Sequence, residues 1–290
     1  MKTFDRAAED LGNSVALEHL NLTVPDQQPA ILFYIMGLGY TRDPYVQVGL
    51  RNMWVNMGRS QIHLPIGKPQ KMRGHVGLVV PDLAALEKRL AEVKEPLAQT
   101  QFSYSRGDGY IEATCPWGNT FRCYEPDPKR FGRVMLGLPY LAFDTKKGTA
   151  AGIGRFYQKV IGAPVEQGKG TNGASVRVKV GTDQYLVFNE IAGDLPAYDG
   201  HHIQLYLANF SGPHRQLAER GLVFEESDQW QYRFKQLVDP ESGEPVYELE
   251  HEIRSVTHPL YARPLVNRNP AQTNRDYHAG HDAMGWTIPH

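Results

Sequence analysis

The sequence has little of three features that would narrow its function at once: cysteine, long apolar runs and an excess of one charge. Only two cysteines occur in 290 residues, Cys115 and Cys123, and their spacing matches no zinc site, so reduced buried thiols are expected rather than a disulfide framework. No apolar run reaches the roughly 20 residues that a membrane helix needs. The formal net charge is −1, which argues against a nucleic-acid or anionic-membrane partner.

Several sequence motifs are also missing. There is no phosphate-binding P-loop, no dinucleotide fingerprint after the first strand, and no serine or cysteine nucleophile in a strand-turn-helix elbow. The first residues, MKTFDRAAEDLGNS, contain no apolar core of the kind found in a secretory signal. We therefore expect a cytoplasmic protein that acts on a small molecule, with no membrane or nucleic-acid partner; a homodimer is left open.

A repeated unit organises the chain. An alternating strand, a short turn and an amphipathic helix recur at residues 17–40, 74–93, 138–164 and 201–222, and three short strand-like runs follow each helix. In the fourth copy, Ser211 is placed as the helix N-cap and Gly221 as its stop. His19, His75, Tyr140 and His202 occupy equivalent positions, at separations of 56, 65 and 62 residues. Each unit thus reads β-α-β-β-β.

Four such modules predict an α+β fold in which the modules are paired into two cup-shaped domains. We expect an N-terminal domain at residues 1–130, a C-terminal domain at 131–255 and an irregular C-terminal arm at 256–290. The segment DPKRFGRVMLG at 127–137 is the expected boundary between the two domains.

Strand alternation indicates which way the histidines point, because successive side chains of a strand face opposite sides of the sheet. Leu20, Leu22 and Val24 share one face, which leaves His19 on the other. By the same reasoning, His63, His75 and His202 each lie on the other face of the sheet from their apolar neighbours in the strand. The apolar faces should pack against the helices, so the histidines should line the concave or solvent side of each sheet.

These units resemble the vicinal oxygen chelate superfamily, which includes glyoxalase I, bleomycin-resistance proteins and extradiol ring-cleaving dioxygenases. The resemblance covers roughly residues 15–255. It rests on the strand-VPD-helix start, FYIMGLG at 33–39, GHVGLVVPDL at 74–83 and the turns WGN at 117–119 and SGE at 242–244. Four modules in one chain are similar to the extradiol dioxygenases in particular.

The resemblance implies metal ligands on the first and last strands of each module. The positions that match are His19, His63, His75 and Arg122 in the first domain, and Tyr140, His202 and Glu248 in the second. Arg122 stands where the family has a carboxylate, and it is a candidate catalytic residue that also binds a substrate oxygen. Tyr140 stands where the family has a histidine, and it is the other candidate catalytic residue. The metal candidates are His19, His63, His75, His202 and Glu248.

Other residues are candidates for lining a pocket. Gln204 and Tyr206 share the face of His202 and are candidate substrate-binding residues. Glu250 shares the face of Glu248. The C-terminal arm is rich in Pro, Asn, Tyr and His, and it could fold back and contribute His258, His278 or His281.

The leading functional interpretation is a mononuclear metalloenzyme, an extradiol-type dioxygenase and hence an oxidoreductase acting on a small aromatic substrate. The metal would be Fe(II), with Zn or Mn as alternatives. A glyoxalase-like isomerase or lyase is one alternative function. A metal-free protein that sequesters a drug or metabolite is the other, and it needs no cofactor.

Overall fold

The computed structural model describes residues 4–43, 51–263 and 265, and the chain divides into two compact units. Unit 1 comprises Met1–Leu17 and Pro139–Ser255, and unit 2 comprises Glu18–Leu138 and Val256–His290. The first long strand, β1, runs through the division after Leu17, so its two halves are assigned to different units. The proposed division into independent domains at residues 130 and 255 stays a prediction.

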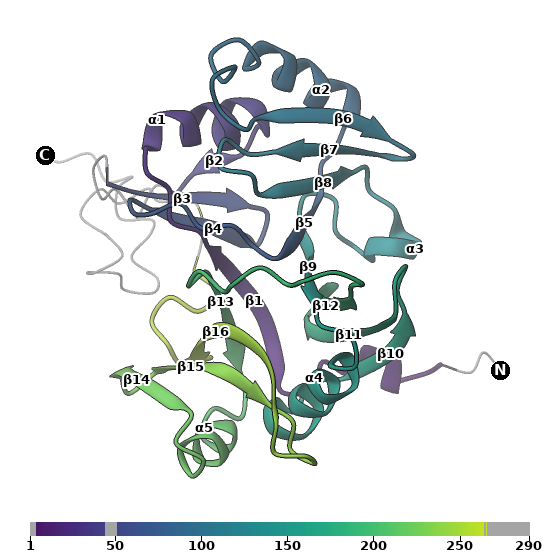
Figure 1. Cartoon of the computed structure of the whole chain (residues 1–290), viewed down its shortest axis with the longest axis vertical. Helices are drawn as coiled ribbons and strands as arrows, with labels where there is room; N and C mark the ends of the chain where they lie inside the picture. The colour runs from purple at the N-terminus through teal and green to yellow at the C-terminus, as the bar shows by residue number, and fades with distance from the viewer. Residues whose placement is uncertain (1–3, 44–50, 264, 266–290) are drawn as a thin grey trace, which may run out of the picture. The chain divides into compact units, whose positions relative to one another are not determined.

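All four predicted β-α-β-β-β modules are present (Figure 1), and the α+β fold class is confirmed. The first module contains β1 (Ser14–Asn21), α1 (Gln27–Ala30) continuing as the π-helical η2 (Ile31–Gly37), β2 (Thr41–Arg42), β3 (Asn52–Met57) and β4 (Ser60–Pro65). The second contains β5 (Gly74–Val79), α2 (Leu83–Glu92), β6 (Ser103–Gly107), β7 (Tyr110–Thr114) and β8 (Thr120–Tyr124).

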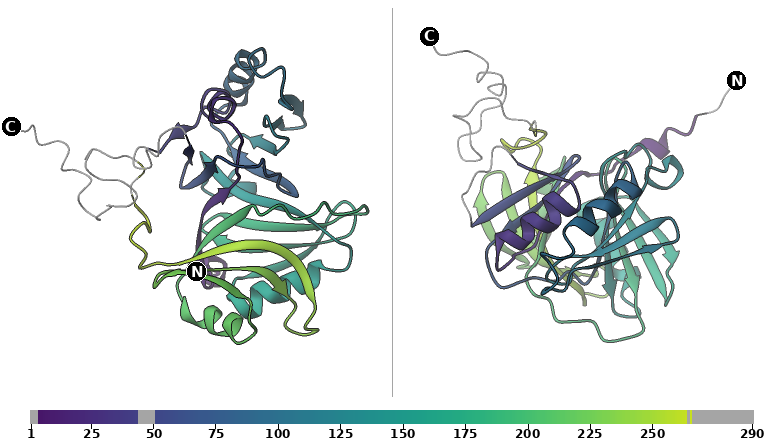
Figure 2. Two further views of the ribbon diagram at one scale, coloured as in Figure 1. Left: turned by 60° about the vertical axis from the view of Figure 1, so that its left-hand side comes forward. Right: turned by 90° about the horizontal axis from the view of Figure 1, so that it is seen from above.

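The third and fourth modules repeat this plan. The third contains β9 (Gly137–Thr145), α4 (Ala150–Phe156) continuing as η3 (Tyr157–Ile161), β10 (Val165–Lys169), β11 (Ala174–Gly181) and β12 (Gln184–Glu190). The fourth contains β13 (His202–Leu207), α5 (Ser211–Ala218), β14 (Val223–Asp228), β15 (Gln231–Val238) and β16 (Pro245–Ser255). Two short helices lie outside the modules, η1 (Ala7–Glu9) and α3 (Pro128–Phe131). Figure 2 shows the long β15 and β16, near the yellow-green end of the colour scale, from two further directions.

The strands form two eight-stranded mixed sheets. One has the order β14-β15-β16-β13-β1-β4-β3-β2, and the other has the order β10-β11-β12-β9-β5-β8-β7-β6. Below, the first is called sheet A and the second sheet B. Strands of the first and fourth modules therefore belong to sheet A, and strands of the second and third belong to sheet B.

Each module pairs its first strand with its last strand in parallel, with a common register. In the fourth module His202 lies opposite Glu250, and Gln204 lies opposite Glu252. In the first module His19 lies opposite Gln61, and Asn21 lies opposite His63. Because strand pairing fixes where side chains emerge, this register decides which residues of the two strands meet on one face.

The apolar faces of the strands form the core, as alternation predicts. Leu20, Leu22, Ile203 and Leu205 are fully buried. Helix α2 presents Leu83, Leu86 and Leu90 to the interior, and the side chain of Asp82 caps its first turn by accepting a hydrogen bond from Ala85 N at 2.9 Å.

The start of α5 differs from the prediction. Ser211 is the first helical residue and not the N-cap, which is Phe210. The capping oxygen comes from Asn209, whose Oδ1 accepts a hydrogen bond from Gly212 N at 3.1 Å. The predicted stop is close: the helix ends at Ala218, and Gly221 follows with a φ of +66°.

The described part of the C-terminal arm is attached by a buried ion pair. Arg263 Nη2 lies 2.6 Å from Asp43 Oδ2, and the same carboxylate oxygen accepts a hydrogen bond from Gln61 Nε2 at 2.6 Å. His258 Nδ1 accepts a local hydrogen bond from Leu260 N. His278 and His281 lie outside the described residues. No helix among the described residues is long and apolar enough to cross a membrane.

Candidate metal centre

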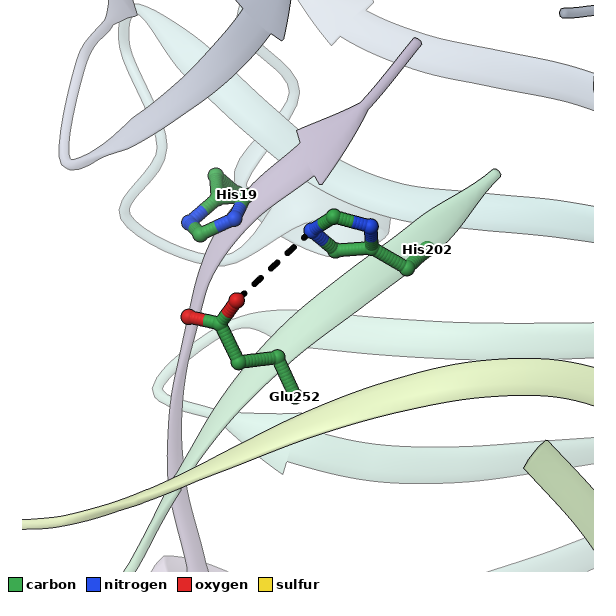
Figure 3. A group of neighbouring side chains, drawn as sticks. All are labelled: His19, His202 and Glu252. Carbon is green, nitrogen blue, oxygen red and sulfur yellow. Dashed lines mark ion pairs between the residues drawn. The ribbon is translucent and has the colours of Figure 1, made fainter. Parts of the chain in front are cut away.

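Strands β13 and β16 bring one histidine beside two carboxylates. His202 Nδ1 lies 3.6 Å from Glu250 Oε1, and His202 Nε2 lies 3.7 Å from Glu252 Oε2. The second of these ion pairs is the dashed line in Figure 3. His202 is 8% exposed and Glu252 is 2% exposed, so the pair is largely shielded from water.

His19 on β1 sits in an aromatic environment of the first module. Its ring lies 4.9 Å from the ring of Trp54 and 6.0 Å from that of His63, measured between centroids. Its Nδ1 lies 3.2 Å from Glu18 Oε2, and the residue is 1% exposed. His63 stacks on Trp54 at 3.9 Å, which fixes the plane of its ring.

His19, His202 and Glu252 form a group with the spacing of metal ligands. One ligand atom from each residue lies within 4.8 Å of the others, and Figure 3 draws the three side chains. Two imidazoles and one carboxylate suit Fe²⁺, Zn²⁺ or Mn²⁺ and form the donor set of non-haem iron oxygenases. The chemistry of these side chains therefore fits a divalent metal.

Two arginines hold the carboxylate of Glu252. Arg233 Nη2 on β15 bonds Glu252 Oε2, and Arg254 Nη2 lies 2.7 Å from Glu252 Oε1. Arg233 also donates through Nη1 to Glu250 Oε1 at 2.6 Å. Burial alone would lower the pKa of Arg233, but Glu252 and Glu250 outweigh it and raise that pKa, so the guanidinium stays charged.

Gln204 and Tyr206 follow His202 on the same face of β13, and both are buried. Among the described residues, neither amide atom of Gln204 has a hydrogen-bond partner. An unsatisfied buried amide costs about 1–3 kcal/mol, so the amide of Gln204 is a candidate hydrogen-bond partner for a bound molecule.

Three predicted site residues belong to strands of sheet B: His75 on β5, Arg122 on β8 and Tyr140 on β9. Burial, and then the charge of Arg122, lower the pKa of His75 to about 4. Arg122 Nε donates to Glu112 Oε2 at 2.8 Å, with both side chains more than a third exposed. Their catalytic, substrate-binding and metal roles stay predictions.

The carboxylate in the ligand group differs from the one named from sequence. Glu248 is 36% exposed, and its Oε1 lies 3.8 Å from Lys235 Nζ. Glu252 lies on the same face four residues further along β16, opposite Gln204. Only Glu248 and Glu250 were named from the sequence. Strand alternation could also have indicated Glu252, because it predicts that Glu248, Glu250 and Glu252 share one face.

No family model matches the chain, and no curated protein sequence matches it. Solved structures do. A putative dioxygenase from Bacillus subtilis subsp. subtilis str. 168 is 16% identical, with a TM-score of 0.55, over 96% of this chain and 92% of that one. Glyoxalase I from Zea mays is 13% identical, with a TM-score of 0.56, over 83% of this chain and 92% of that one.

These similarities confirm the fold and leave the activity open. The chain shares its fold with these two solved structures, and the four modules that its motifs predicted are present in two eight-stranded sheets. At this level of identity a shared fold carries no particular reaction, because one fold supports many chemistries.

Proposed function

We propose that the chain is a mononuclear metalloenzyme in which His19, His202 and Glu252 bind a divalent metal. The observation that carries the proposal is the buried His202–Glu252 pair within unit 1, in which His202 Nε2 lies 3.7 Å from Glu252 Oε2; His19 is the third donor of the group. A divalent metal held there would supply Lewis-acid chemistry that stabilises an anion formed on a small substrate.

Extradiol-type ring cleavage of a small aromatic substrate is the favoured reaction, with Fe(II) as the metal. Two histidines and one carboxylate are the donor set of non-haem Fe(II) oxygenases, which need open positions for a substrate and for O₂. The similarity to a putative dioxygenase over 96% of this chain is consistent with that reaction.

In this proposal Gln204 and Tyr206 contribute to substrate binding. The amide of Gln204 offers a donor and an acceptor two residues after His202. Because the amide is buried, a hydrogen bond to a substrate oxygen would stabilise the bound substrate. The phenol of Tyr206 lies two residues further along the same face of β13. The cytoplasmic location and the homodimer stay predictions.

A glyoxalase-like isomerase or lyase is the second candidate, and His63 is the observation that favours it. The register places His63 opposite Asn21, two residues after His19, where it would supply a third imidazole. With three imidazoles and one carboxylate, a Zn²⁺ that expands to five-coordination would still accept a substrate oxygen and act as a Lewis acid. Loss of metal in His63→Ala would favour this candidate over the dioxygenase.

The testing experiment is metal analysis of untagged protein, purified anaerobically without chelators and then reconstituted with Fe²⁺. We expect close to one equivalent per chain, greatly reduced in Glu252→Gln and unchanged in the matched control Glu248→Gln. A loaded protein is then assayed with catechols and oxygen, and with α-ketoaldehyde adducts. No metal before or after reconstitution would leave the metal-free binding protein as the surviving interpretation.

A further inference from the structure

We propose that Arg233 is a positioning residue that holds Glu252 in the metal-free protein and competes with the metal for it. The proposal rests on the metal site proposed above. In the metal-free protein the guanidinium of Arg233 neutralises Glu252 in place of the metal. This competition lowers the affinity for the metal and keeps its binding reversible.

The first support is the atom that Arg233 contacts. Arg233 lies directly opposite Glu252 in the antiparallel β15–β16 pair, and its Nη2 bonds Oε2 of that carboxylate. Oε2 is also the oxygen that faces His202 Nε2 at 3.7 Å. The oxygen best placed to bind a metal beside His202 is therefore the one that the guanidinium occupies.

The second support is the local charge. Two guanidiniums, those of Arg233 and Arg254, already lie against the buried carboxylate of Glu252 without a metal. A bound dication would lie within a few ångströms of a guanidinium in a poorly hydrated place. Like charges repel strongly there, because screening by water is weak.

The third support is the arrangement of the remaining contacts of Glu252. Arg254 Nη2 lies 2.7 Å from Oε1, so one guanidinium still neutralises the carboxylate when Arg233 is removed. Arg254 is itself held by its Nε, which donates to Gln231 Oε1 at 2.8 Å. Loss of Arg233 should thus remove repulsion and competition without releasing Glu252.

The experiment compares Zn²⁺ dissociation constants of metal-free proteins, measured by competition with a chromophoric chelator. Arg233→Met is expected to bind Zn²⁺ at least about tenfold more tightly than the wild type. Arg233→Lys, which keeps the charge, should stay within about threefold. The matched control is Lys235→Met on the same strand, which removes a cation 3.8 Å from Glu248 and should leave the constant unchanged.

An opposite result is well defined, because residues that merely orient a ligand weaken metal binding about 10–100-fold when they are removed. An unchanged or weaker Zn²⁺ affinity in Arg233→Met would overturn the proposal while leaving the metal site intact. Absence of Zn²⁺ binding in every variant and in the wild type would overturn the metal site as well. If circular dichroism shows that Arg233→Met does not fold, Arg233→Gln replaces it, because its amide can still donate to Glu250.

Discussion

Sheet A and sheet B use the same register and carry different chemistry. Each module has two equivalent site positions. One is a residue on the first strand, and the other is the last-strand residue that lies opposite the residue two places further along that first strand. In sheet A these positions hold His19, His63, His202 and Glu252, and in sheet B they hold His75, Arg122, Tyr140 and Val187. Sheet A thus presents metal donors at all four positions, whereas sheet B has a cation and an apolar residue at two of them.

A reversed ion pair accompanies this difference. In the fourth module Glu252 on the last strand lies opposite Arg233 on the strand before it. In the second module Arg122 on the last strand lies opposite Glu112 on the strand before it. The same two backbone positions hold a carboxylate–guanidinium pair in both modules, but the carboxylate occupies the ligand position only in the fourth. The backbone sets where a group is placed, and the residue type decides what it binds.

The largest effect is expected from replacing a first-strand histidine of sheet A, His202, and the matched replacement in sheet B is His75. His202→Ala is expected to weaken Zn²⁺ binding at least about 100-fold, because a direct ligand contributes no less than the groups around it. His75→Ala should leave the dissociation constant unchanged. Competition titrations of the two variants make the comparison, and a loss of affinity in His75→Ala alone would transfer the metal site to sheet B.

A second difference lies on the apolar face of β16, where His251 takes the place that Phe121 has in the second module. His251 is fully buried, stacks on Phe234 and lies with its Nε2 2.7 Å from the hydroxyl of Tyr157. Desolvation lowers its pKa from 6.5 to about 4. The folded state therefore resists protonation of this ring between pH 6.5 and pH 4, while the unfolded state accepts the proton.

His251 therefore makes the stability of the fold depend on pH. The ring costs no stability above pH 6.5, and it reduces the free energy of unfolding by about 2 kcal/mol at pH 5. His251→Phe should abolish that part of the loss, although it leaves the hydroxyl of Tyr157 without this partner at every pH. Urea denaturation at pH 7.5 and pH 5 measures the change. His75→Phe, measured alongside, gives the separate contribution of the other histidine whose pKa is lowered. An equal pH dependence in wild type and His251→Phe would contradict the assignment.

The smallest effect is expected from exchanging the pair in sheet B. Arg122→Glu combined with Glu112→Arg gives the second module the charge order of the fourth. Both side chains are more than a third exposed, so their coupling free energy should be about 0.5–1 kcal/mol in a double-mutant cycle. No second metal equivalent should bind, because His75 and the new carboxylate would be the only imidazole and carboxylate donors at these four positions. Binding of a second equivalent would show that the register alone is enough to make a site.

Much of the fold follows from the sequence because it depends on local patterns. The period-2 runs predict the strands, and the recurrence of His19, His75, Tyr140 and His202 predicts the four modules. Alternation also places His202 and Gln204 on one face. These are properties of neighbouring residues, and neighbouring residues are what a single sequence contains.

The carboxylate that lies beside His202 could not be chosen in the same way. Glu248, Glu250 and Glu252 share a face of one strand, and only the register between β16 and β13 distinguishes them. Which modules contribute to one sheet is likewise a matter of long-range pairing, and no local pattern encodes it. The capping of α5 was missed for a smaller reason: Asn209 and Ser211 are both good capping residues, and the chain uses the earlier one.

The parallel pairing of first and last strands has an evolutionary consequence. Because the ligand positions are defined by backbone register, a module can lose or regain a donor through one substitution without any change of fold. Val187 and Arg122 occupy such positions, and the strands that carry them are as regular as those of sheet A. A module of this kind can therefore keep its scaffold while the residues at its site positions change.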